Sequence, residues 1–155
     1  VCAGALPQLV LPKVYDHADF PAWNKKYSEK LKVVADDIAQ MLRTVPELTV
    51  NPTQGAFYMV PTFKPGVLNN KQSLPIKNED IKKYIEQLVA KPGLPLVKRF
   101  TYYLLAATGI VCVPASDFFT KHHGFRITTL ERDPGKRKAT YTMFTSAIRS
   151  YLESA

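Results

Sequence analysis

The sequence predicts an α/β fold of the α+β kind, in which helices cover a small mixed or antiparallel sheet. Apolar residues recur every three or four positions in several segments, and this is the period of an amphipathic helix. Short runs rich in aromatic and β-branched residues lie between these segments and are typical of strands. The predicted order is helix, strand, helix, helix, strand, strand, helix, which suits a layered small domain.

The first predicted helix covers residues 25–43, KKYSEKLKVVADDIAQMLR. Its apolar residues form one stripe with charges opposite, namely Tyr27, Leu31, Val34, Ile38 and Leu42. Pro46 ends this helix, and a turn leads to AFYMVPTF at residues 56–63, which predicts a strand. Because Pro61 has no N–H to donate, it places a bulge or a sheet edge near the end of that strand.

Two more helices are predicted after a loop at residues 64–78. Asn78 is a suitable N-cap for the first of them. Its apolar stripe consists of Ile81, Ile85, Leu88 and Val89. The second covers residues 97–108 and is followed by Gly109, which suits the left-handed conformation that often ends a helix.

The last part of the chain predicts two strands and a helix. GIVCVP at residues 109–114 is nearly all apolar, and GFRITTLE follows at residues 124–131. Asp133 and Pro134 are the residue types of an N-cap and a first helical position. The apolar face of the final helix consists of Tyr141, Phe144, Ile148, Tyr151 and Leu152.

The composition is that of a folded globular chain of one domain. Of the 155 residues, 46% are hydrophobic and 22% are charged. No apolar run reaches the roughly 18 residues that span a bilayer, and no secretory signal is recognisable. We therefore expect a soluble protein of the cytoplasm, with mitochondria as the alternative. Cys2 and Cys112 are the only cysteines, which favours a reducing compartment.

A net charge of +8 is compatible with nucleic-acid binding. The basic residues are spread along the chain, however, and no aromatic residues alternate with them as in a stacking platform. We interpret the charge as a solvated surface, and we expect neither a nucleic-acid nor a membrane partner.

The chain contains no complete catalytic or metal-binding motif. His122 and His123 are adjacent without a third ligand nearby, so we interpret them as exposed turn residues and expect no metal. Ser116 lacks the Gly-x-Ser-x-Gly context of a nucleophile and is expected to cap a turn. Cys112 lies in an apolar run and is expected in the core.

Arg126 stands in the middle of a predicted strand. In a pleated strand Phe125 and Ile127 face one side of the sheet, and Arg126 faces the other. A guanidinium is costly to bury, so a half-buried Arg126 requires an anion beside it. That anion is either a structural carboxylate or a ligand.

Three separated blocks resemble pyridoxal-phosphate-dependent aminotransferases of fold type I, and within them the alanine aminotransferase branch. The blocks are NPTQGAFYMVP at residues 51–61, YYLLAATGIVCVPASDFF at 102–119 and GFRITTLE at 124–131. They follow the order of the family's N-P-x-Q-G-A-x-Y, G-I-x-V-V-P-G-S-x-F and F-R-x-T-x-L segments. Ala115 stands where the family usually has glycine, and Asp117 follows the serine, which leaves the substrate preference open.

The resemblance implies a C-terminal small domain at residues 25–155, with residues 1–24 as a linker from a missing large domain. The parent enzyme would transfer an amino group between an amino acid and a 2-oxo acid, and would form a homodimer. The family attaches its pyridoxal 5'-phosphate to a lysine in a Ser-x-x-Lys segment, which this sequence lacks. The cofactor site is therefore expected outside this chain. We expect no catalytic residue within the chain, and we expect the isolated chain to be inactive.

The resemblance also implies two substrate-binding residues. Arg126 occupies the position of the arginine that binds the substrate α-carboxylate. Tyr58 lies on a strand that approaches the substrate pocket, although an aromatic residue in a strand is as often part of the core. The alternative function is a non-catalytic binding or regulatory module that retains the fold, and the sequence does not identify the amino donor.

Overall fold

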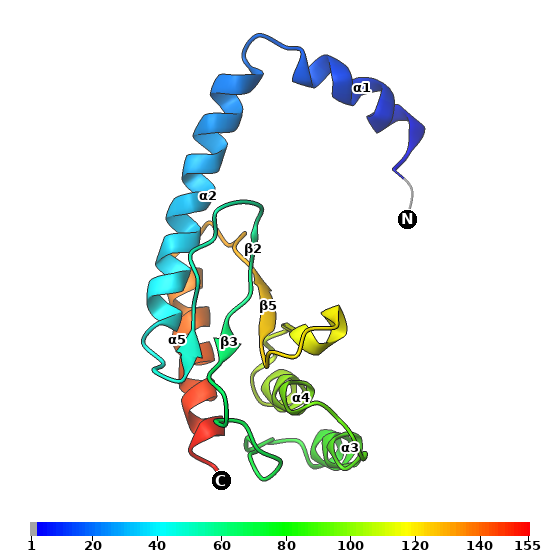
Figure 1. Ribbon diagram of the computed structural model, residues 1–155, viewed down its shortest axis with the longest axis vertical. Helices are drawn as coiled ribbons and strands as arrows, with labels where there is room; N and C mark the ends of the chain where they lie inside the picture. The colour runs from blue at the N-terminus through cyan, green and yellow to red at the C-terminus, as the bar shows by residue number, and fades with distance from the viewer. Residues whose placement is uncertain (1–2) are drawn as a thin grey trace.

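The computed structural model describes residues 3–155, in which helices surround two small antiparallel sheets (Figure 1). In chain order the elements are α1 (Ala5–Tyr15), α2 (Phe20–Leu42), β1 (Leu48–Thr49), β2 (Tyr58–Met59), β3 (Thr62–Phe63), α3 (Glu79–Val89), α4 (Leu96–Thr108), β4 (Val113–Pro114), the 3-10 helix η1 (Ala115–Phe118), β5 (Phe125–Thr128) and α5 (Pro134–Leu152). The predicted fold class is thereby confirmed.

Strand β5 is the centre of the three-stranded sheet, with β2 on one side and β4 on the other. Both neighbours are antiparallel to β5, and Tyr58 pairs with Thr128 while Val113 pairs with Arg126. β1 and β3 form a second, two-stranded sheet. Pro61 separates β2 from β3, as its missing N–H predicts, and its carbonyl accepts a hydrogen bond of 3.0 Å from the N–H of Phe125.

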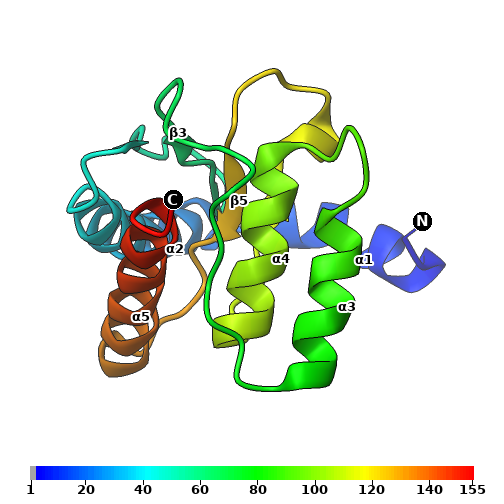
Figure 2. The same ribbon diagram turned by 90° about the horizontal axis from the view of Figure 1, so that it is seen from below.

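The helices pack in two groups on either side of the strands. Figure 2 shows α2 and α5 together on one side of β5, and α3 and α4 together on the other. The core between them is aromatic: the fully buried ring of Phe100 lies against Phe63, Phe125 and Tyr151, with centroids 5.1, 5.6 and 5.2 Å apart. This core covers the face of β5 that carries Phe125 and Ile127.

Several helix ends follow from single residues. The side chain of Asn78 accepts hydrogen bonds from the N–H groups of Asp80 and Ile81, and Asp133 accepts one from Lys136 with Pro134 in the first turn. Gly109 ends α4 with φ of 75°, a conformation that costs a residue with a Cβ atom. These three predicted ends are confirmed.

Other elements differ from the prediction. α1 was not expected at all, and α2 begins at Phe20 rather than at residue 25. The expected strands at 109–114 and 124–131 are shorter, because regular pairing covers only Val113–Pro114 and Phe125–Thr128. Ile81, assigned to the buried stripe of α3, is 45% exposed. The N-terminal half of α3 therefore extends beyond the core.

α1 and the first turns of α2 extend away from the rest of the chain (Figure 1). α1 contains no buried residue, although much of it is apolar. Its exposed large apolar residues are Leu6, Leu9, Val10, Leu11, Val14 and Tyr15. Across residues 3–155, none of the helices combines the length and the apolar character needed to cross a membrane.

Candidate functional site

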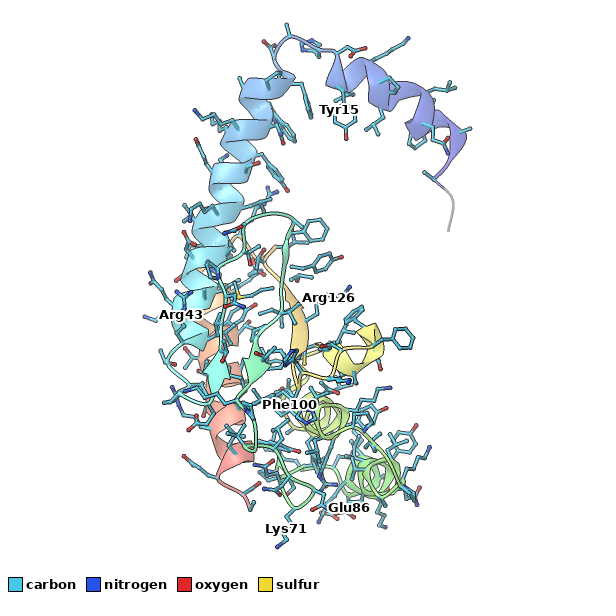
Figure 3. All side chains as sticks on the ribbon, in the orientation of Figure 1. Tyr15, Arg43, Lys71, Glu86, Phe100 and Arg126 are labelled. Atoms are coloured by element: carbon cyan, nitrogen blue, oxygen red, sulfur yellow. The ribbon has the colours of Figure 1, made fainter. Side chains whose placement is uncertain are left out.

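Arg126 lies on the central strand β5, on the side of the strand opposite α5 (Figure 3). Its neighbours Phe125 and Ile127 are buried in the core, whereas the Arg126 side chain is half-buried. The alternation predicted from the pleat is thus observed. The core holds β5 from one face, and Arg126 projects from the other.

Arg126 differs from the other arginines in its polar contacts. Within residues 3–155 its guanidinium makes no hydrogen bond or ion pair with another residue. The remaining arginines each donate at least one hydrogen bond, namely Arg43, Arg99, Arg132, Arg137 and Arg149. The described chain therefore supplies no structural carboxylate for Arg126.

Two aromatic rings contact the Arg126 guanidinium instead. Its Cζ atom lies 4.5 Å from the ring centroid of Tyr58 on β2 and 4.9 Å from that of Phe118 on η1. Tyr58 is 38% exposed, so it is not a core residue. Cation–π contacts use the flat face of a guanidinium, while its N–H donors point outward in the plane. Because the N–H donors of Arg126 make no hydrogen bond within residues 3–155, they are available to a planar anion such as a carboxylate.

The 3-10 helix η1 is held beside this arginine by two contacts and by the burial of its first residue. Ala115 is buried, and its N–H donates to the carbonyl oxygen of Gly124 at 2.7 Å. Lys98 Nζ of α4 lies 2.6 Å from a carboxylate oxygen of Asp117. This hydrogen bond to Asp117 raises the pKa of Lys98 and outweighs the lowering by desolvation, so the Lys98 ammonium stays protonated.

The other residues singled out from the sequence lie in different surroundings. Cys112 is buried as expected, and burial raises the pKa of its thiol to about 12. The hydroxyl of Ser116 is buried without a hydrogen-bond partner among the described residues, so the predicted cap is wrong. His122 is exposed and His123 is half-buried. In the part of the chain that the structure describes, no three His, Cys, Asp or Glu side chains are grouped to hold a metal.

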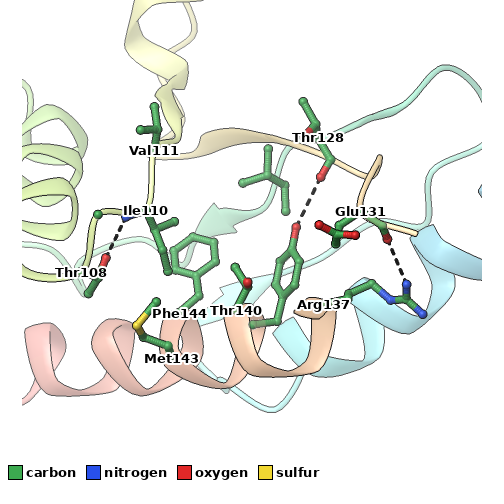
Figure 4. A pocket seen from close by; sticks show the side chains of 12 residues that line it. Thr108, Ile110, Val111, Thr128, Glu131, Arg137, Thr140, Met143 and Phe144 are labelled. Carbon is green, nitrogen blue, oxygen red and sulfur yellow. Dashed lines mark hydrogen bonds between the residues drawn. The ribbon is translucent and has the colours of Figure 1, made fainter. Parts of the chain in front are cut away.

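A pocket of about 420 Å³ lies on the other side of β5, against α5 and residues 108–111 (Figure 4). The charged side chains that line it already form hydrogen bonds with other groups of the chain. Arg137 donates to Asp37 and to the carbonyl oxygen of Glu131, and the Glu131 carboxylate accepts from the N–H of Asp133. Because Arg126 does not line this pocket, the free arginine and the pocket are separate features.

Sequence reasoning identified Arg126 and Tyr58, and the structure brings them into contact. It did not identify Phe118, whose ring contacts the same guanidinium from η1, or Lys98 of α4, which pairs with Asp117 of η1. Two signals for Phe118 were available: it stands at the F of the family's G-S-x-F segment, and it is followed directly by a second large apolar residue, Phe119.

Comparison with known proteins shows which proteins the chain is related to. No protein-family model matches it. An uncharacterized aminotransferase of Methanocaldococcus jannaschii is 31% identical over 154 residues, which is 99% of this chain. This chain is homologous to an aminotransferase. It spans 35% of the length of that relative, so about two thirds of the relative has no counterpart here.

Solved aminotransferase structures share the fold. The aspartate aminotransferase of Rhizobium meliloti matches with a TM-score of 0.60 and 21% identity, over 81% of this chain and 27% of the other. An aspartate aminotransferase of Rhodobacter sphaeroides matches with a TM-score of 0.57 and 15% identity, over 87% and 27%. This chain therefore has the fold of one part of such enzymes.

Proposed function

We propose that this chain is the C-terminal small domain of a pyridoxal-phosphate-dependent aminotransferase of fold type I, in which Arg126 binds the α-carboxylate of the substrate. The parent enzyme would move an amino group between an amino acid and a 2-oxo acid. The observation that carries the proposal is the half-buried Arg126 guanidinium, which has no polar partner in the described chain. The homology over 99% of the chain supports the enzyme class.

The role of Arg126 follows from the shape of its side chain. A guanidinium donates two parallel hydrogen bonds to a carboxylate, and so fixes both the position and the orientation of the amino acid. Held on β5 between its two neighbouring strands, Arg126 has a rigid base for this purpose. Orientation matters in transamination because the bond to be broken must be aligned with the cofactor, and pre-set alignment lowers the barrier.

The described residues around Arg126 and η1 do not fit the attachment of pyridoxal phosphate. Attachment of that cofactor requires a lysine whose amine loses its proton, whereas the Lys98 ammonium beside η1 donates a hydrogen bond to Asp117, which raises the pKa of Lys98. The described residues around Arg126 are mainly aromatic. We therefore assign the cofactor, its lysine and the acid–base chemistry to the part of the enzyme outside this chain, and expect the isolated chain to be inactive.

The exposed apolar surface of α1 supports the proposed linker at residues 1–24. Large exposed apolar areas mark surfaces that bind other protein. Tyr15, Phe20, Trp23 and Tyr27 continue this surface as a row of contacting rings, with successive centroids 4.9, 6.1 and 5.2 Å apart. In the proposed enzyme this row packs against the large domain. The assignment to the alanine aminotransferase branch, and to a homodimer, rests on the sequence blocks alone.

The decisive experiment is the substitution Arg126→Lys in the intact enzyme that contains this chain. Lysine keeps the charge but loses the two parallel donors, so we expect the KM for the amino acid to rise about tenfold or more. Arg99→Lys is the matched control, because Arg99 also lies over a tyrosine ring but donates to the carbonyl oxygen of Gln72. An unchanged KM in Arg126→Lys would remove the assigned role.

The alternative is a non-catalytic binding module with the same fold. The coding sequence upstream of Val1 separates the two functions. An open frame with a Ser-x-x-Lys segment, together with transaminase activity of its product, is expected for the enzyme. A start codon directly before Val1, or amino-acid binding without turnover in the complete polypeptide, is expected for the binding module.

A further inference from the structure

Phe118 has no structural reason to lie where it does. Its side chain is 48% exposed, so the core gains little from it, and its neighbour Phe119 is 100% exposed. The Phe118 ring nevertheless lies 4.9 Å from Cζ of Arg126, while no aromatic or cation–π contact within residues 3–155 involves Phe119. Of two adjacent phenylalanines, one is directed at the free arginine.

The contact depends on a short helix that is held from two sides. At its start, the N–H of Ala115 donates a hydrogen bond to the carbonyl oxygen of Gly124, the residue before β5. One residue before Phe118, the Asp117 carboxylate is bonded to Lys98 of α4 at 2.6 Å. Because α4 belongs to the core, this ion pair connects the position of Phe118 to the rigid part of the domain.

We propose that Phe118 is a positioning residue for carboxylate binding by Arg126, and that the Lys98–Asp117 ion pair holds Phe118 against the guanidinium. This inference rests on the proposed function of Arg126. Tyr58 and Phe118 approach the guanidinium from two separate elements, β2 and η1. Both rings attract its flat face, so together they restrict the side chain before the carboxylate arrives.

We expect the Phe118 ring to strengthen binding of the amino acid. A long, flexible side chain loses rotational freedom when it forms two hydrogen bonds to a ligand, and a side chain that is already restricted loses less. Removing Phe118 should therefore weaken binding of the amino acid and leave the chemical step unchanged. A role in folding alone would show the opposite pattern, with a lower amount of active enzyme and an unchanged KM.

The geometry can be tested on the 155-residue chain by NMR of the arginine Nε–H groups. The Arg126 signal is assigned by its loss in Arg126→Lys. Phe118→Leu removes the ring and keeps an apolar side chain, so we expect the Arg126 signal to move toward the position of a free arginine. Phe119→Leu is the matched control, one residue away and fully exposed, and should leave the signal unchanged. The same signal position in Phe118→Leu and in the unsubstituted chain would overturn the inference.

The functional test uses the intact enzyme. Phe118→Leu should raise the KM for the amino acid about twofold to fivefold at constant kcat, the loss expected for one cation–π contact, and Phe118→Trp should restore it. Lys98→Gln, Asp117→Asn and the double variant should each raise KM by the same smaller factor, because any of them breaks the same ion pair. Equal KM values in Phe118→Leu and the unsubstituted enzyme would overturn the inference.

The two proposals fail in different ways. If Arg126→Lys raises KM and Phe118→Leu does not, Arg126 keeps its role and Phe118 loses its own. If Arg126→Lys leaves KM unchanged, the carboxylate role is wrong and the positioning role falls with it, whatever the NMR signal shows. A rise of KM in both variants, with rescue by tryptophan, supports both.

Discussion

Asp37 and Arg137, which are 100 positions apart in the chain, are joined by a hydrogen bond of 2.6 Å between a carboxylate oxygen and Nε. Nη1 of the same guanidinium donates to the carbonyl oxygens of Glu131 and Arg132, at 2.9 and 3.3 Å. The Arg137 side chain is only 7% exposed. It thus connects α2, α5 and the loop that follows β5.

Replacing Arg137 by methionine should destabilise the fold by about 1–3 kcal/mol, because a buried chain of similar size remains but the hydrogen bonds are lost. Urea unfolding followed by circular dichroism measures this difference. Lys138→Met is the matched control, since Lys138 is the next residue and is exposed. Equal unfolding midpoints for the two variants would contradict the structural role of Arg137.

The aromatic core gives a second prediction. Phe100 has no exposed surface and contacts three other rings, so Phe100→Ala leaves a cavity beneath β5. We expect a loss of about 3–5 kcal/mol in the free energy of unfolding, the usual range for a buried phenylalanine. Phe119→Ala serves as the comparison, since its ring is fully exposed and its loss should change the free energy by less than about 0.5 kcal/mol. Similar losses in the two variants would show that Phe100 is not central to the core.

The elements predicted correctly are those that local chemistry determines. Asn78, Gly109 and Asp133 end or begin helices through bonds to residues within a few positions, so their side chains alone identify the boundary. The alternation around Arg126 is likewise a property of one strand.

The features that were missed depend on partners far along the chain. α1 is apolar but has neither a buried stripe nor a side-chain cap, so no helical pattern identifies it. The position of Phe118 depends on Asp117 reaching Lys98 on another helix. The resemblance to a family singled out Arg126 and Tyr58, but a short sequence pattern cannot show that Asp117 pairs with a lysine 19 positions earlier in the chain.

Burial of Cys112 gives a third prediction. The thiolate is the reactive form, and burial raises the pKa of this thiol to about 12, so at pH 8 very little of it is available. In a Cys2→Ser variant, which leaves Cys112 as the only thiol, a disulfide reagent should react at least about tenfold more slowly in buffer than in denaturant. Equal rates would show that Cys112 is accessible in the folded chain.

The last prediction concerns alkaline pH and Tyr141 of α5, whose buried ring lies against Phe144 and whose hydroxyl reaches Thr128 of β5. Burial raises the pKa of Tyr141 from 10.0 to about 12, and the nearby Arg137 lowers it by less. A pKa that is higher in the folded state means that the folded chain holds the proton more tightly. The unfolded chain therefore loses its proton first, and stability falls as the pH rises from about 10 toward 12.

Tyr141→Phe removes this dependence without emptying the site. The hydroxyl donates one long hydrogen bond, 3.4 Å to the carbonyl oxygen of Thr128. Its removal should therefore lower the free energy of unfolding only slightly at pH 8. Between pH 8 and pH 11 the free energy of unfolding should fall by about 1 kcal/mol more in the unsubstituted chain than in the variant. Urea unfolding at the two pH values measures the difference. Tyr84→Phe removes a hydroxyl from a ring that is 60% exposed and should leave the alkaline loss unchanged. If Tyr141→Phe lost as much stability as the unsubstituted chain, the Tyr141 hydroxyl would have to be hydrated in the folded protein.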